Sequence, residues 1–118
     1  MNRRRVGARG EDLAAEYLRG KGYSIVERNY RAAGGEVDII ARKGDSLVFV
    51  EVKTDRSGEF GPPELWVTPA KRRQIAKVAS AYLAKNPASG LEIRFDVIGI
   101  SLGGATATVN HIEDAFWL

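Results

Sequence analysis

Asp38, Glu51 and Lys53 are charged residues in apolar surroundings, and together they predict a partly buried site with carboxylate chemistry. Asp38 lies in the stretch Val-Asp-Ile-Ile, and Glu51 lies in Phe-Val-Glu-Val. Two buried carboxylates are costly unless positive charge compensates them. Lys53 supplies one positive charge, and a divalent cation would supply two. Hard oxygen ligands favour Mg²⁺ or Mn²⁺ at such a site.

The dipeptide Gly44-Asp45 separates two apolar stretches and predicts a tight β-hairpin. Counting outward from this turn places Asp38 opposite Glu51 and Glu36 opposite Lys53. Facing residues on antiparallel strands have Cβ atoms roughly 4.5–5.5 Å apart. Period-two alternation then puts these four charged residues on one face of the sheet. The other face is apolar and consists of Val37, Ile39, Val48, Val50 and Val52.

A third carboxylate is expected from the helix predicted over residues 7–19. Glu11 precedes Ala14 by three residues and Leu18 by seven, so it belongs to the stripe that packs against the sheet. We therefore expect Glu11 to approach the hairpin carboxylates. Spacing alone leaves a second interpretation open, in which the hairpin charges form a solvated strand face with a Glu36–Lys53 salt bridge.

The remaining pattern predicts a mixed α/β domain in the order αβββαββ, with helices flanking a central sheet. Thr68-Pro69 is an N-cap followed by proline at the first helical position, so a second helix should run from there to Lys85. Residues 55–67 are rich in glycine and proline and predict a loop. The predicted strands are residues 23–30, 36–42, 46–54, 92–100 and 105–112.

The bulk properties favour one cytoplasmic domain over residues 1–118. A chain of 118 residues suits a single core. The absence of cysteine excludes disulfides, thiolate metal sites and cysteine nucleophiles. The apolar runs are too short to cross a membrane, and the basic N-terminus lacks the apolar segment of a signal peptide.

Basic residues are concentrated in two places and predict a polyanionic partner. The net charge is +3, which alone is a weak indication of nucleic-acid binding. At the start of the second helix, a basic cluster would suit phosphate contacts because the helix dipole is positive there. A solvated helix start is the competing interpretation. The two groups are Arg3, Arg4 and Arg5, and Lys71, Arg72, Arg73 and Lys77.

These motifs resemble the core of PD-(D/E)XK nucleases, and more closely the bacterial YraN family of uncharacterised proteins. The resemblance begins with Gly35-Glu36-Val37-Asp38 and Phe49-Val50-Glu51-Val52-Lys53. It extends over nearly the whole chain through Gly10-Glu11, Arg28-Asn29-Tyr30, Lys71, Arg94-Phe95-Asp96-Val97 and His111-Ile112. It implies a restriction-endonuclease-like fold, similar to that of archaeal Holliday-junction resolvases.

The resemblance also implies roles for individual residues. Asp38, Glu51 and Glu11 would bind the metal together with the carbonyl of Val52, and Lys53 would orient or activate the attacking water. Val37 stands where the motif's name has proline, and this change removes no ligand. We expect Glu36 to pair with Lys53 and hold it in place.

Three functions follow as hypotheses, and the last of them is a partner-binding protein with a vestigial site. The first is a metal-dependent endonuclease that hydrolyses phosphodiester bonds in DNA, with branched DNA as a candidate substrate. The second is a nucleic-acid-binding module that retains the fold with little or no catalysis. A domain of this size grips one side of a junction, which favours a homodimer. His111 is the chain's one histidine, and we expect it to be a structural strand residue.

Overall fold

The computed structural model describes residues 3–55 and 66–116, without the side chains of residues 3–7. The helices and strands follow one another in the predicted order αβββαββ, which is confirmed. Their bounds are α1 (Arg3–Gly20), β1 (Ser24–Ala32), β2 (Gly35–Lys43), β3 (Ser46–Asp55), α2 (Pro69–Lys85), β4 (Glu92–Ser101) and β5 (Thr108–Ile112).

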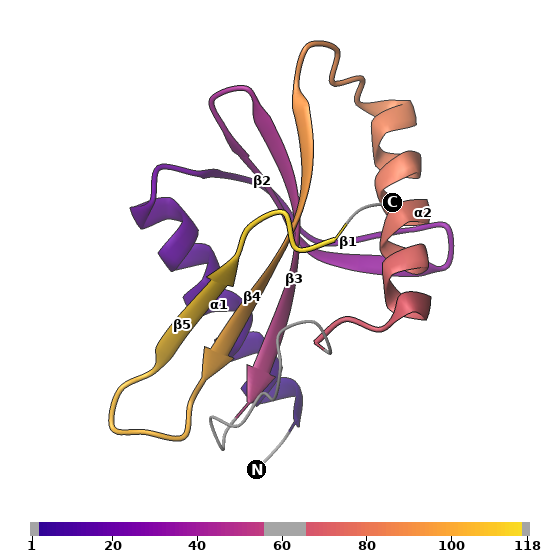
Figure 1. The fold of residues 1–118 in the computed structure, drawn as a ribbon. Helices are drawn as coiled ribbons and strands as arrows, with labels where there is room; N and C mark the ends of the chain where they lie inside the picture. Colours follow the sequence, from indigo (N-terminus) through magenta and orange to yellow (C-terminus); the bar gives the residue numbers. More distant parts are fainter. Residues whose placement is uncertain (1–2, 56–65, 117–118) are drawn as a thin grey trace.

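The described strands form one mixed sheet in the order β1-β2-β3-β4-β5. Neighbouring strands are antiparallel except β3 and β4, which are parallel and are connected through α2. A parallel pair requires such a crossover connection. The strand β3 therefore lies at the centre of the sheet, with α1 and α2 on opposite sides of it (Figure 1).

Each helix covers its own hydrophobic core. On the α2 face, Phe49 and Phe95 of the sheet pack with Ile75 and Val78 of the helix. A separate cluster on the other face joins α1 to β2, β3 and β4, and its members include Ala14, Leu18, Ile39, Val48, Val50 and Ile98. Because β3 is covered on both faces, it is continuously buried from Leu47 to Val50, as expected for a central strand.

The helix boundaries follow from local capping chemistry. The hydroxyl of Thr68 accepts a hydrogen bond from the Lys71 backbone N–H at 3.2 Å, so the predicted N-cap is confirmed, and α2 ends at Lys85 as expected. The helix α1 begins at Arg3, earlier than predicted, and β5 begins at Thr108, later than predicted. Of the predicted loop, Asp55 belongs to β3, and residues 56–65 lie outside the described part.

The register of the β2–β3 hairpin is as predicted near the turn, from Lys43 opposite Ser46 to Ile39 opposite Val50. The prediction that pairing continues to Asp38 and Glu51 is wrong. Asp38 instead accepts a hydrogen bond from the backbone N–H of Val52 at 2.7 Å. The regular pairing of β2 with β3 therefore ends at Ile39 and Val50, directly before Asp38 and Glu51.

The prediction that Val37 lies on the same face of the sheet as Ile39 is also wrong. Val37 packs in the α2 cluster, whereas Ile39 packs in the α1 cluster, so the alternation of β2 breaks at Asp38. The backbone explains the break. Asn29 of β1 has a φ of 52°, and Asn29 and Asp38 are left out of the β1–β2 pairing. Asparagine tolerates this left-handed conformation better than most residues.

Among the described residues, no helix is long and apolar enough to span a membrane.

Candidate metal centre

Glu51 lies at the end of the buried stretch of β3. Its side chain is 15% exposed, and the Nζ of Lys71 on α2 lies 3.8 Å from its Oε2 atom. This Oε2 is buried and has no hydrogen-bond partner among the described residues. A buried carboxylate oxygen without a bonded partner is costly, and it is also free to bind a cation.

Asp38 is the neighbour that most affects the charge of Glu51. Burial and then the adjoining Asp38 carboxylate raise the pKa of Glu51 to about 9, while Lys71 opposes the rise. One oxygen of Asp38 is already bonded to the Val52 amide. Lys71 therefore offsets only part of the cost of charging Glu51.

Glu11 joins this pair from α1, as predicted from its place on the buried stripe. Burial, followed by the charge of Asp38, raises the pKa of Glu11 to about 7. The helix approaches β3 closely because Gly10 has no side chain. A Cβ on Gly10 would lie 2.0 Å from Oγ1 of Thr54, far inside contact distance.

Glu36 is linked to the same group by Asn29. With its amide nitrogen turned toward the carboxylates, Asn29 donates to Glu36 at 2.9 Å and to Glu11 at 3.0 Å. The ion pair of Glu36 is made by Arg31 at 3.8 Å. The predicted Glu36–Lys53 ion pair does not occur between these two described residues, because β2 and β3 no longer pair at that level.

The donor chemistry of Glu11, Asp38 and Glu51 fits a divalent cation, since all three offer carboxylate oxygens and one of these oxygens is buried without a bonded partner. In residues 3–55 and 66–116, no set of three acidic or histidine side chains already stands in a metal-binding arrangement. Mg²⁺ is commonly held by one or two protein carboxylates with water completing its coordination. A cation here would therefore rely first on Asp38 and Glu51.

Some of the basic residues predicted to bind nucleic acid contact other protein groups, and others are exposed. Lys71 faces Glu51, whereas Arg73 and Lys77 are exposed on α2. Arg72 donates to the Val67 carbonyl at 3.2 Å and lies over the ring of Phe116, so it anchors the start of the helix. Lys53 is exposed on β3. The backbone of Arg3, Arg4 and Arg5 is helical, and their side chains lie outside the described residues.

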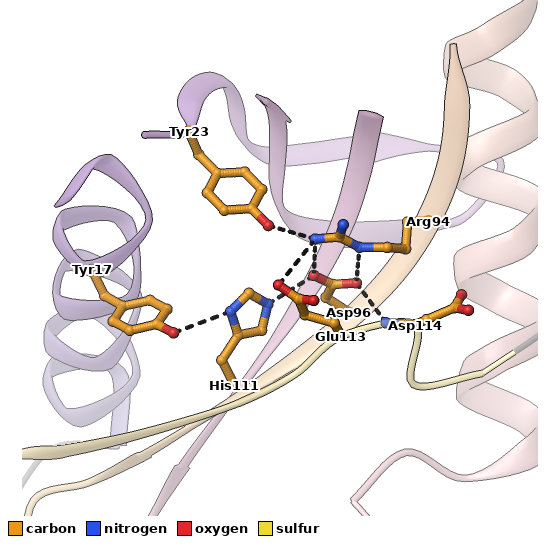
Figure 2. A network of polar contacts seen from close by, with 7 residues as sticks. All are labelled: Tyr17, Tyr23, Arg94, Asp96, His111, Glu113 and Asp114. Carbon is orange, nitrogen blue, oxygen red and sulfur yellow. Dashed lines mark hydrogen bonds and ion pairs between the residues drawn. The ribbon is translucent and has the colours of Figure 1, made fainter. Parts of the chain in front are cut away.

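Asp96 forms a second buried acidic site that the sequence reasoning did not single out. It is 0% exposed. Arg94 donates to both of its oxygens, at 2.9 and 2.8 Å, and the Asp114 backbone N–H donates at 2.9 Å. The Nε2 atom of His111 lies 2.7 Å from Oδ2, which completes the network (Figure 2).

This Asp96 network attaches α1 and the start of β1 to β4 and β5. His111 lies 3.3 Å from the hydroxyl of Tyr17 on α1, and Arg94 donates to the hydroxyl of Tyr23 at 2.5 Å (Figure 2). Burial acts to raise the pKa of Asp96, but the hydrogen bonds from His111, Arg94 and Asp114 outweigh it and lower the pKa. The expectation that His111 is structural agrees with these contacts. The signal in the sequence was the Arg-x-Asp spacing on a strand otherwise rich in apolar residues.

The fold and the two acidic sites define a mixed α/β protein with an incompletely compensated carboxylate cluster beside the middle of a central strand. The model of the Uncharacterised protein family UPF0102 matches residues 10–100, so the chain belongs to this family. Membership of the YraN family, as UPF0102 is also called, was predicted from the sequence and is confirmed.

Relatives named UPF0102 proteins match over nearly their full length. The relative from Geobacter metallireducens is 48% identical over 118 residues, which cover 100% of this chain and 97% of the relative. That from Geobacter sulfurreducens is 52% identical over 114 residues, covering 96% and 89%. That from Syntrophomonas wolfei is 49% identical over 116 residues, covering 98% and 100%.

The raised pKa of Glu51 predicts how stability depends on pH. A carboxyl whose pKa rises on folding stabilises the protein fully below about pH 4.5, and this contribution is lost as pH increases toward 9. In cation-free buffer, the free energy of unfolding should fall over this window. Glu51→Gln should flatten the fall and make the protein about 1–3 kcal/mol more stable at pH 8. Urea unfolding at several pH values measures this.

Glu16→Gln, on the exposed side of α1, is the control and should follow the wild type. A Glu51→Gln variant that is less stable than wild type at pH 8 would show that the carboxylate is compensated in the free protein.

Removing the charge of Asp96 should destabilise the protein, which is opposite to the effect expected at Glu51. Asp96→Asn leaves Arg94, whose side chain is 14% exposed, without its charged partner, and should cost about 3 kcal/mol or more. Glu113→Gln is the matched control, since Glu113 lies 3.8 Å from the same guanidinium but is largely exposed, and it should change little. Equal urea midpoints for Asp96→Asn and wild type would contradict a structural role for this network.

Proposed function

We propose that the protein is a metal-dependent endonuclease that hydrolyses phosphodiester bonds in DNA, with branched DNA as a candidate substrate. The observation that carries the proposal is the buried Oε2 of Glu51, which has no hydrogen-bond partner among the described residues and lies beside Asp38 and Glu11. A fold that gathers several carboxylates without neutralising them loses stability, and a divalent cation provides the missing charge.

Asp38 and Glu51 would hold Mg²⁺ or Mn²⁺, with Glu11 and the carbonyl of Val52 as further ligands. Such an ion polarises a phosphoryl oxygen and lowers the pKa of a bound water. The hydrogen bond from the Val52 N–H fixes one Asp38 oxygen, so the other oxygen would hold the cation. Asn29 orients Glu11 and Glu36 by donating to both.

Lys53 would provide positive charge on the solvent side of the centre. It follows Glu51 by two residues on β3 and is exposed, so its ammonium group is free to meet a substrate. Preorganised positive charge stabilises the negative charge that develops on phosphate in the transition state. We assign Lys53 this role or the orientation of the attacking water.

The start of α2 would bind the nucleic-acid backbone. Lys71, Arg73 and Lys77 lie in its first turns, where the helix dipole adds positive potential. Contacts of this kind bind phosphate without reading sequence, which suits a substrate recognised by its shape.

The proposal is tested with labelled duplex, single-stranded and four-way-junction DNA in Mg²⁺ or Mn²⁺. Wild type should cut at least one of these, and Asp38→Asn, Glu51→Gln and Lys53→Met should each lose about 100-fold or more in rate. Glu16→Gln should retain the wild-type rate. Lys53 is exposed, and Glu51→Gln is expected to stabilise the fold, so the losses in these two variants would not come from unfolding.

Equal cleavage by wild type and the three variants would overturn the assigned site. Tight binding of DNA by wild type without cleavage in either metal would favour the second function, a nucleic-acid-binding module.

A further inference from the structure

An open groove of about 560 Å³ lies between the β1–β2 turn and α2. One wall is the segment from Arg31 to Glu36, and the other is formed by Lys71 and Gln74. Glu36 and Lys71 also belong to the surroundings of the carboxylate cluster, so the groove opens directly beside the candidate metal centre.

Two glycines allow the β1–β2 turn to lie against α2 beside this groove. Gly34 has a φ of 78°, which favours glycine, and its carbonyl accepts a hydrogen bond from the Gln74 amide at 3.5 Å. A Cβ on Gly35 would lie 2.5 Å from Cγ of Gln74, so the helix rests directly on the turn. Arg31 is 80% exposed on the opposite wall, where it lies 3.8 Å from Glu36 and offers a second cation. A groove with a cation on each wall suits an anionic strand.

Lys71 stands at the boundary between the groove and the carboxylates. Its ammonium nitrogen lies 3.8 Å from Oε2 of Glu51, within ion-pair range but without a hydrogen bond. The same nitrogen donates to the Gln74 side chain at 3.2 Å. Lysine has a flexible stem and a compact charge, so this ammonium group can turn toward the groove at small cost.

We propose that the groove binds a phosphate of the nucleic-acid strand next to the metal centre, and that Lys71 is an exchangeable counter-cation. Lys71 compensates Glu51 when no divalent cation is present and turns to the strand phosphate when one binds. This inference rests on the proposed function and deepens it. Because one side chain serves both ligands, the cation and the strand each strengthen binding of the other.

The first measurement uses Mn²⁺ alone and the full chain, by titration calorimetry without DNA. Lys71→Met removes the charge that competes with the cation at Glu51, so Mn²⁺ should bind about 3–10-fold more tightly than to wild type. Lys85→Met removes the same charge from the exposed far end of α2 and should leave Mn²⁺ affinity unchanged. Unchanged or weaker Mn²⁺ binding by Lys71→Met would overturn the inference.

The second measurement is the binding of a short single-stranded oligonucleotide, with Ca²⁺ or with chelator, by fluorescence anisotropy. Ca²⁺ should strengthen binding to wild type and to Lys85→Met, and Lys71→Met should lose most of that gain. A methylphosphonate strand, which carries no backbone charge, should bind wild type and Lys71→Met equally. An undiminished Ca²⁺ effect in Lys71→Met would contradict the exchange.

Failure of the proposed function can be distinguished from failure of the inference about Lys71. If neither wild type nor the variants bind Mn²⁺, the metal centre fails, and the proposed function and this inference fail with it. If wild type binds Mn²⁺ and cuts DNA while Lys71→Met behaves like Lys85→Met, the inference alone is overturned.

Discussion

Repulsion among partly buried carboxylates is the constraint on which the site depends. Asp38 and Glu51 approach each other where β2 and β3 stop pairing, and Glu11 reaches them from α1. Repulsion and burial together raise the pKa values of Glu11 and Glu51. In the absence of a divalent cation, Lys71 compensates this cluster incompletely.

The same fold contains a buried carboxylate, Asp96, that is fully compensated, in contrast to Glu51. Asp96 receives a two-pronged hydrogen bond from Arg94, a contact from His111 and a backbone N–H (Figure 2). Glu51 has an oxygen with no bonded partner in the described part of the chain. Since the architecture can neutralise a buried acid fully, the incomplete compensation of Glu51 supports the proposed cation ligand.

The two acidic sites are mechanically related through α1. This helix carries Glu11 toward Asp38 and Tyr17 toward the Asp96 network. Gly10 permits its close approach to Thr54 of β3. The compensated site thus helps to fix the position of the helix that delivers a carboxylate to the uncompensated one.

Local patterns in the sequence were sufficient for the elements and for most of the site. Thr68-Pro69 defines the start of α2, and the short turn at Gly44 fixes the hairpin register. The break at Asp38 could not be predicted, because it depends on the backbone of Asn29 in another strand. The partner of Glu51 was missed for a similar reason, since Lys71 meets it through packing of α2 and not through strand pairing.

The most direct test of the metal centre is anomalous diffraction at the manganese edge from crystals soaked in Mn²⁺. The account predicts a manganese peak about 2.0–2.3 Å from carboxylate oxygens of both Asp38 and Glu51, with Lys71 turned away from Glu51. A manganese peak at other residues, with Lys71 still beside Glu51, would contradict it.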